Sequence, residues 1–308
     1  MIAGEWAVLD GNRCIVAAVN KRVHSIVEPL AGGYISVSID DYKLQDIRFT
    51  WDGTNINLFK IYQVDAEKLK FTKESIEVAL RFLKENNLGF SPFKIRTYGE
   101  ETQIEVNGDV KKVGFGSSAA AVVAIISSIL NFHNYIPEKE EIYKLATIAH
   151  YYAQGKVGSA FDVAASTYGG VIVYKRFDAT WLTKKIETGE ELSSIVKDEW
   201  PSFFVEALEL PENLCMAIAW TRETASTGGM VKQMDSFKQS NPERYNKLYH
   251  DIAHAVELLI HAWKSNDKEK MLDSIRKNKD YLRQLTKECG VNIETPELSQ
   301  LAEIAEKY

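Results

Sequence analysis

Residues 111–130 read KKVGFGSSAAAVVAIISSIL, where a glycine-flanked turn leads into a run of small and aliphatic residues. The run predicts a helix, and Ser118 is well placed to be its N-cap. The N-terminus of a helix leaves four backbone amides without intrahelical partners and carries a partial positive charge. Gly114 and Gly116 would let these amides approach a ligand, and Ala119 keeps the first turn free of bulky side chains. The stretch therefore predicts a cradle for a polyphosphate.

Three neighbouring side chains support this interpretation. Ser117 offers a further hydroxyl, and Lys111 and Lys112 supply positive charge just upstream. A Walker A loop fits less well, because it needs a lysine directly before the serines. A dinucleotide-binding Gly-x-Gly-x-x-Ala turn also fits less well, since no acid follows about twenty residues later. A glycine-containing turn that leads into an ordinary core helix is the remaining alternative.

The composition excludes several classes of protein. The 308 residues are 45% hydrophobic and 26% charged, with a net charge of −6, which argues against a partner that is nucleic acid or an anionic membrane. Three cysteines far apart give no disulfide framework or metal motif and suit a reducing compartment. No apolar run is long enough to span a bilayer, and the first twenty residues do not resemble a signal peptide. We therefore expect a cytoplasmic protein.

The hydrophobic patterns predict an α+β fold in two domains, residues 1–187 and 188–308. Runs rich in β-branched residues predict strands at 14–27, 34–40, 93–99, 102–106, 169–177 and 214–220, with a hairpin turn at 107–108. Helical periodicity and capping signals predict helices at 73–87, 137–155, 228–239, 242–264, 267–289 and 296–308.

A second glycine-containing segment, AQGKVGSAFDVAASTYGG at residues 153–170, carries one acid at the start of a helix of small residues. Acids are seldom buried without a partner. From the residues alone, Asp162 could either cap that helix or take part in chemistry.

A third segment, AWTRETASTGGMVKQM at residues 219–234, combines hydroxyls, glycines and a guanidinium between a predicted strand and a predicted helix. Such a junction predicts a further anion site. A solvated Ser/Thr loop with an ordinary N-cap is the alternative.

Together these segments resemble the GHMP small-molecule kinase superfamily, and within it the branch that phosphorylates 5-phosphomevalonate. The superfamily's Gly-Leu-Gly-Ser-Ser-Ala loop is matched by residues 114–119, and GKVGSAFDVAASTYGG is similar to the stretch that carries the family's catalytic aspartate. GEWAVLDG at residues 4–11 resembles the second half of the family's first motif. The resemblance covers nearly the whole chain.

The resemblance implies a fold, two ligands and a set of site residues. The expected fold is a ribosomal-S5-domain-2-like N-terminal part and a ferredoxin-like C-terminal part, with ATP and Mg²⁺ in the groove between them. Catalytic roles fall to Asp162 and Lys112. The ATP-binding residues would be Lys111, Gly114, Gly116, Ser117, Ser118 and Ala119. The residues that bind the acceptor would be Glu5, Lys156, Ser159, Trp220, Arg222, Ser226 and Thr227. The magnesium ion would lie near Ser117, Ser118 and Asp162.

The expected activity is ATP-dependent phosphorylation of (R)-5-phosphomevalonate by a monomer or homodimer. Two family features have no counterpart: a lysine upstream of Gly4 and a third, glycine-rich loop after residue 308. We expect that the sequence is clipped at both ends. The alternatives are a kinase of mevalonate or another small alcohol, and a non-catalytic relative that only binds ligand.

Overall fold

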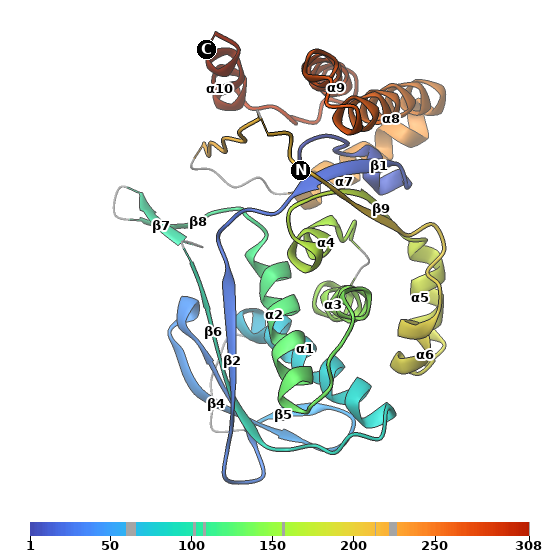
Figure 1. Ribbon diagram of the computed structural model, residues 1–308. Helices are drawn as coiled ribbons and strands as arrows, with labels where there is room; N and C mark the ends of the chain where they lie inside the picture. The colour runs from blue at the N-terminus through green and yellow to red at the C-terminus, as the bar shows by residue number, and fades with distance from the viewer. Residues whose placement is uncertain are drawn as a thin grey trace.

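The computed structural model describes residues 1–59, 66–100, 103–106, 109–155, 158–212, 214–221 and 227–307. Two β-sheets organise the described chain (Figure 1). The larger sheet and its helices hold most of the N-terminal half, and the smaller sheet lies between that part and the C-terminal helices (Figure 1). The candidate site lies near the smaller sheet.

The larger sheet has five strands in the order β2-β6-β3-β4-β5. All neighbouring strands are antiparallel except β3 and β6, which run parallel. In β6, buried Phe93, Ile95 and Thr97 alternate with exposed Lys94 and Arg96, so one face packs on the core. The strands are β2 (Val23–Pro29), β3 (Ile35–Ile39), β4 (Leu44–Trp51), β5 (Ile56–Leu58) and β6 (Phe93–Gly99).

Four helices pack together, and two of them, α1 and α2, contact this sheet. The central one, α2, contacts β2, α1, α3 and α4. Its small and aliphatic run is suited to this position, because Val122, Ile125, Ile126 and Ile129 are all fully buried. The four are α1 (Ala66–Glu85), α2 (Ser117–Phe132), α3 (Lys139–Gln154) and α4 (Phe161–Tyr168).

The smaller sheet has three antiparallel strands in the order β1-β9-β10. In β1, Cys14 faces the large N-terminal core, whereas Ile15 faces α8 on the opposite side. Because both faces are covered, four consecutive residues of β9 are buried. The strands are β1 (Arg13–Ala17), β9 (Val171–Lys175) and β10 (Phe204–Leu208).

The remaining elements surround these two sheets. Two 3-10 helices, η1 (Ala7–Asp10) and η2 (Asp40–Tyr42), and a hairpin, β7 (Gln103–Val106) with β8 (Asp109–Lys112), lie in the N-terminal half. The other helices are α5 (Ala179–Glu187), α6 (Leu192–Lys197), α7 (Thr227–Ser240), α8 (Pro242–Lys264), α9 (Lys268–Cys289) and α10 (Pro296–Lys307). The last three lie over the smaller sheet at the end of the molecule that carries the C-terminus (Figure 1). Among the described residues, no helix is both long and apolar enough to cross a membrane.

Most of the predicted elements are present, and the α+β class is confirmed. The strand predicted at 214–220 is wrong, because its described residues pair with no strand and Met216 and Ile218 are 43% and 54% exposed. β-propensity describes only the local sequence, whereas a strand needs a partner. The domain division at residue 187 stays a prediction; Leu192 and Trp200 belong to the same core as the N-terminal elements.

Candidate active site

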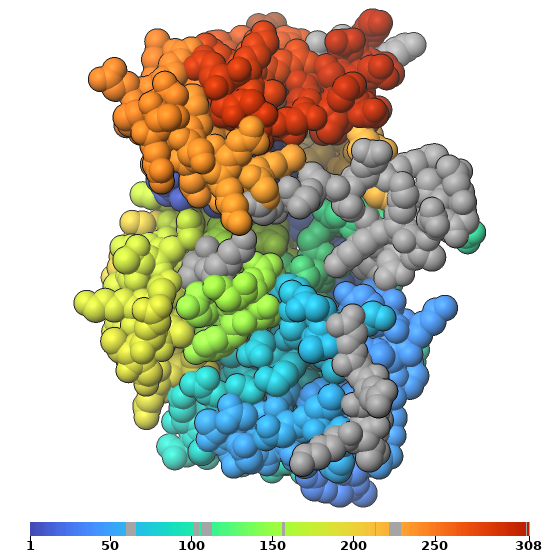
Figure 2. Space-filling model, turned by 180° about the vertical axis from the view of Figure 1, so that it is seen from behind, coloured from blue at the N-terminus to red at the C-terminus, as the bar shows by residue number. Residues whose placement is uncertain are grey.

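A cleft of about 930 Å³ lies between the N-terminal ends of α2 and α4. Gly114, Phe115 and Gly116 form one part of its lining, and Asp162 lies on α4. Residues 216–219 line the cleft as well. In the view from behind the molecule, the C-terminal helices lie above the N-terminal part, and α8 packs on the smaller sheet (Figure 2). The lining of the cleft thus brings together segments that are far apart in the sequence, from Met1 to Ala219.

Gly116, rather than Ser118, is the N-cap of α2. It has a φ of 79°, in the left-handed region that favours glycine, and the helix begins at Ser117. A Cβ placed on Gly116 would lie 3.7 Å from the Cβ of Asp162. The prediction that Ser118 is the N-cap is therefore wrong, because the left-handed turn at Gly116 starts the helix earlier. The cap has no side chain, so no side-chain cap competes with a ligand for the amides at this end of α2.

Asp162 is the second residue of α4 and is half-buried. Its Oδ1 accepts a hydrogen bond of 3.0 Å from the backbone amide of Val163. The positive end of the helix dipole stabilises a carboxylate at this position. Ala160, buried and left-handed with a φ of 55°, turns the chain into α4. The carboxylate is thus placed by the backbone at the entrance of a helix.

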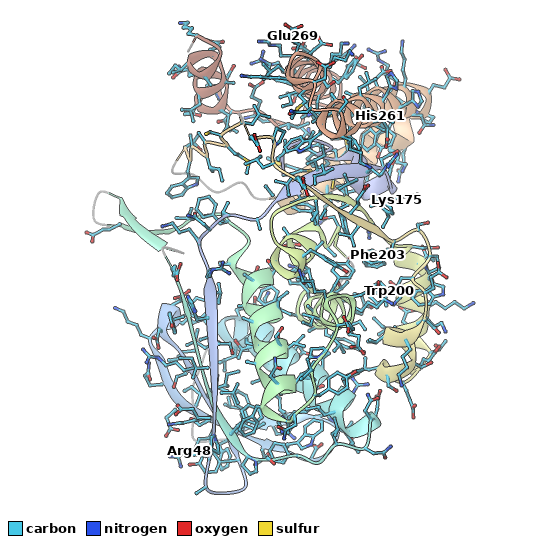
Figure 3. The ribbon with its side chains drawn as sticks, in the orientation of Figure 1. Arg48, Lys175, Trp200, Phe203, His261 and Glu269 are labelled. Atoms are coloured by element: carbon cyan, nitrogen blue, oxygen red, sulfur yellow. The ribbon has the colours of Figure 1, made fainter. Side chains whose placement is uncertain are left out.

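A pair of buried tyrosines holds the segment that precedes α4. The hydroxyl of Tyr174, on β9, donates a hydrogen bond of 2.7 Å to the carbonyl oxygen of Ser159. The hydroxyls of Tyr143 and Tyr174 are 2.8 Å apart. The ring of Tyr143 stacks on Phe203 with centroids 4.7 Å apart, in the aromatic cluster that also holds Trp200 (Figure 3). Burial raises the pKa of both tyrosines, so both are neutral donors.

His150, on α3, lies close enough to Asp162 for their charges to interact. Its side chain is 9% exposed, its ring lies 5.0 Å from that of Phe71, and its Nε2 has no hydrogen-bond partner among the described residues. Burial lowers the pKa of the His150 imidazole, and the negative charge of Asp162 acts in the opposite direction. Burial therefore favours the neutral form of this imidazole near the carboxylate.

A second cavity, of about 250 Å³, lies on the other side of the first turn of α2. Ser117 and Ser118 line it together with the aromatic rings of Phe71 and Tyr98. Val23, at the start of β2, lines both this cavity and the large cleft. The amides at the start of α2 therefore lie between a small cavity with aromatic walls and a large cleft.

The structure brings some of the predicted site residues together and leaves others apart. Gly114, Gly116 and Asp162 line the large cleft, and Ser117 and Ser118 line the second cavity. Ala119 is fully buried beneath them, and Ser159 is half-buried beside Tyr174. Trp220 is half-buried directly after the lining residues 216–219.

Glu5 is not among the described residues that line either cavity. Its Oε2 is buried without a hydrogen-bond partner among the described residues. Burial, and secondly the charge of Glu5, raise the pKa of the neighbouring Cys14 thiol to about 12. Its predicted contact with the acceptor stays a prediction.

The other predicted residues cannot be placed in the site. Lys156, Arg222 and Ser226 lie outside the described residues. Lys111 and Lys112 are on β8, and Thr227 begins α7. The side chains of these three residues lie outside the described part of the structure. Their roles stay predictions.

Sequence reasoning missed one part of the lining, the loop between β1 and β2. Lys21 and Arg22 of this loop line the large cleft. The loop carries no glycine motif, and its two basic residues resemble any solvated pair in the sequence. Lys21 and Arg22 lie at the cleft because the loop that carries them connects β1 and β2, which belong to different sheets. The sequence alone does not show this.

Oxygen donors in the two adjoining cavities, on either side of the first turn of α2, suit a hard cation bound together with phosphates. No group of three or more His, Cys, Asp or Glu side chains that could hold a metal ion occurs within the described part of the chain. Magnesium is usually bound by one or two carboxylates together with substrate phosphates. Asp162 and the hydroxyls of Ser117 and Ser118, at the start of a helix whose amides attract anions, are oxygen donors of this kind.

Comparisons with known proteins show which family and which proteins this chain is similar to. Residues 74–170 match the family model for the N-terminal domain of GHMP kinases. The phosphomevalonate kinase of Streptomyces sp. (strain CL190) is 28% identical over 314 residues, which cover 99% of this chain and 81% of that protein.

Two solved structures have a similar fold. A Listeria innocua protein, Lin0012, aligns with a TM-score of 0.87 and 31% identity over 99% of this chain and 82% of that one. The phosphomevalonate kinase of Streptococcus pneumoniae, solved with phosphomevalonate and AMPPNP, aligns with a TM-score of 0.77 and 21% identity, over 99% of this chain and 83% of that one.

Proposed function

Because the chain belongs to the GHMP kinase superfamily, we propose that it transfers the γ-phosphoryl group of ATP to (R)-5-phosphomevalonate, giving 5-diphosphomevalonate and ADP. This reaction belongs to the mevalonate route to isoprenoids. The similarity to the Streptomyces phosphomevalonate kinase, which extends over 99% of the chain, supports this acceptor over other small alcohols.

One observation carries the proposal: the N-cap glycine of α2 lies against Asp162 on the wall of the same cleft. Phosphoryl transfer depends mostly on positioning and on electrostatic stabilisation. A glycine-flanked helix N-terminus can bind a triphosphate, and an acid beside it can orient the acceptor. The small cavity lined by Phe71 and Tyr98 is suited to the nucleotide base, since aromatic walls favour a flat ring. The large cleft is left for the acceptor.

In the proposed reaction, an oxygen of the acceptor's phosphate forms a bond to the γ-phosphorus of ATP. The bond between that phosphorus and the β–γ bridging oxygen breaks, and ADP leaves. Because the acceptor's phosphate is already ionised near neutral pH, it needs little help from a general base. Asp162 therefore acts mainly by orienting the acceptor, and the amides that follow Gly116 hold the phosphates of ATP.

Magnesium would supply positive charge to the transferred group when bound. Asp162 and the hydroxyls of Ser117 and Ser118 are the residues that would hold it. Lys111, Lys112, Lys156 and Arg222 are proposed to supply further positive charge. A cytoplasmic location and a monomeric or homodimeric state are also proposals.

A coupled assay of ADP release tests the function. We expect turnover with ATP and 5-phosphomevalonate, and at least tenfold lower kcat/KM with mevalonate, which lacks the phosphate, corresponding to about 1.4 kcal/mol or more. Faster turnover with mevalonate would instead indicate a kinase of the alcohol. Binding of both ligands without release of ADP would indicate a non-catalytic relative.

A further inference from the structure

The loop between β1 and β2 brings two basic side chains into the large cleft. It leads from the smaller sheet to the larger sheet and passes near the start of α2 (Figure 1). Lys21 and Arg22 line the cleft, and they are the only basic side chains among its described lining residues. Asp162 is the only acidic one in the same set.

The backbone of this loop is fixed by Glu100, which follows β6. The amide of Glu100 donates a hydrogen bond of 2.8 Å to the carbonyl oxygen of Arg22, which continues the β2–β6 ladder by one residue. The amide of Arg22 donates in turn to Oε2 of Glu100 at 3.3 Å. His24 also contacts this carboxylate, with its Nε2 2.7 Å from Oε1, and its ring stacks on Tyr98. Hydrogen bonds of its amide and its carbonyl, both to Glu100, therefore fix the backbone of Arg22.

Apart from the N-terminal ends of α2 and α4, the rest of the described cleft lining offers no basic side chain to neutralise an anion. Much of it is apolar, including Phe115, Val123, Met216 and Ile218. Lys21 and Arg22 are both exposed to solvent, so a ligand that enters the cleft can reach their side chains. The protein as a whole carries a net charge of −6, so a cleft that takes anions needs local positive charge. Lys21 and Arg22 provide such charge, and Val23, the next residue, lines both cavities.

We propose that Lys21 and Arg22 form a phosphate-binding pair at the place where the two cavities adjoin. This inference rests on the proposed function, since it requires that phosphorylated substrates enter the cleft. The guanidinium of Arg22 can bind a phosphate through two parallel hydrogen bonds, and the ammonium of Lys21 adds a point charge. The phosphate belongs either to the acceptor or to the nucleotide, and the experiment distinguishes the two.

Calorimetry with 5-phosphomevalonate and with AMPPNP tests the pair without depending on turnover. Arg22→Gln and the double variant Lys21→Gln/Arg22→Gln are compared with the wild type and with Lys184→Gln. Lys184 is exposed on α5 and lines neither cavity, so its variant removes one charge away from the site. We expect at least tenfold weaker binding of one ligand by Arg22→Gln, and still weaker binding by the double variant. Arg22→Lys should retain part of the affinity.

The outcomes separate the inference from the proposed function. Weaker binding of 5-phosphomevalonate alone assigns the pair to the acceptor, and weaker binding of AMPPNP alone assigns it to the nucleotide. Affinities that match those of Lys184→Gln for both ligands would overturn the pair, even if the wild type is an active kinase. If the wild type bound both ligands but released no ADP, the proposed function would be wrong. The affinities of the variants would still decide whether Lys21 and Arg22 bind a phosphate. Thermal denaturation of each variant checks that the fold is retained.

Discussion

Gly116 and Asp162 are in close proximity: a Cβ on the glycine would lie 3.7 Å from the Cβ of the aspartate. The glycine ends a loop that precedes α2, and the aspartate lies in the first turn of α4, so the two helix N-termini converge on one cleft. The positive ends of both helix dipoles are therefore directed at the same region. An anion bound there would be stabilised by both helices and would lie beside a carboxylate.

Gly116→Ala should impair both stability and activity. With a φ of 79°, alanine at this position would cost about 1–2 kcal/mol of folding free energy. Its methyl group would also contact Asp162 and narrow the proposed binding site for the phosphates of ATP. Gly89→Ala is a matched control, because a Cβ there meets nothing within 4 Å. Urea denaturation measures the free energy of unfolding, and steady-state kinetics measure kcat and KM. If Gly116→Ala and Gly89→Ala gave equal values, the left-handed conformation of Gly116 would not be required.

Asp162→Asn should lower kcat by about 100-fold or more, because the orienting charge next to the transferred group is lost. The affinity for ATP should change little, since the amides that follow Gly116 remain. Asp273→Asn, which removes a carboxylate paired with Lys277 on α9, is the control and should retain full turnover. Wild-type turnover in Asp162→Asn would remove this residue from the mechanism.

The parts of the fold and site that follow from local signals could be predicted from the sequence. Glycine and serine before a run of small residues predict α2, and Asp162 stands out as a lone acid in an apolar segment, which the structure places in the first turn of α4. The α3 helix ends at Gln154 with Gly155 as its C-cap, within one residue of the end that the sequence predicts. Such signals lie within a few residues of one another.

The parts that depend on long-range contacts could not be predicted. Arg22 reaches the cleft only because β1 and β2 belong to different sheets. Tyr174 holds Ser159 through a contact that no spacing in the sequence indicates. Residues 214–220 have the composition of a strand, but no described strand pairs with them. Long-range contacts, rather than local propensity, determine the position of Arg22, the hydrogen bond of Tyr174 and the conformation of residues 214–220.

Tyr174→Phe should destabilise the protein by about 1–3 kcal/mol, because it leaves the carbonyl of Ser159 and the hydroxyl of Tyr143 without this partner. Turnover should fall as well, since the segment before Asp162 loses its anchor. Tyr143→Phe is the matched control, because Tyr174 can still donate to Ser159. Urea denaturation and kinetics compare the two variants. A larger loss of turnover in Tyr143→Phe would contradict this role of Tyr174.

The same tyrosines predict a loss of stability in alkali. Burial raises the pKa of Tyr143 and Tyr174 in the folded protein, whereas an unfolded tyrosine titrates near pH 10. Their contribution is therefore complete below about pH 10 and is lost as the pH rises above that value. The free energy of unfolding, measured by urea between pH 8 and 11, should decrease less steeply in Tyr174→Phe than in the wild type. If the free energy of unfolding changed with pH in the same way for both proteins, the raised pKa of Tyr174 would not cause the loss of stability between pH 8 and 11.

His150 predicts a loss of stability on the acid side. Its pKa is lowered in the folded protein, chiefly by burial, while Asp162 partly opposes the shift. An unfolded histidine titrates near pH 6.5, so the contribution of the neutral ring is complete above that pH and is lost as the pH falls toward and below the lowered pKa. His150→Gln cannot take up a proton, and it should lose less stability than the wild type between pH 7.5 and 5. His261→Gln, at an exposed position on α8 (Figure 3), should follow the wild-type curve. If His150→Gln and His261→Gln gave the same pH dependence in urea denaturation, the buried imidazole behind Asp162 would not be the group that senses acid.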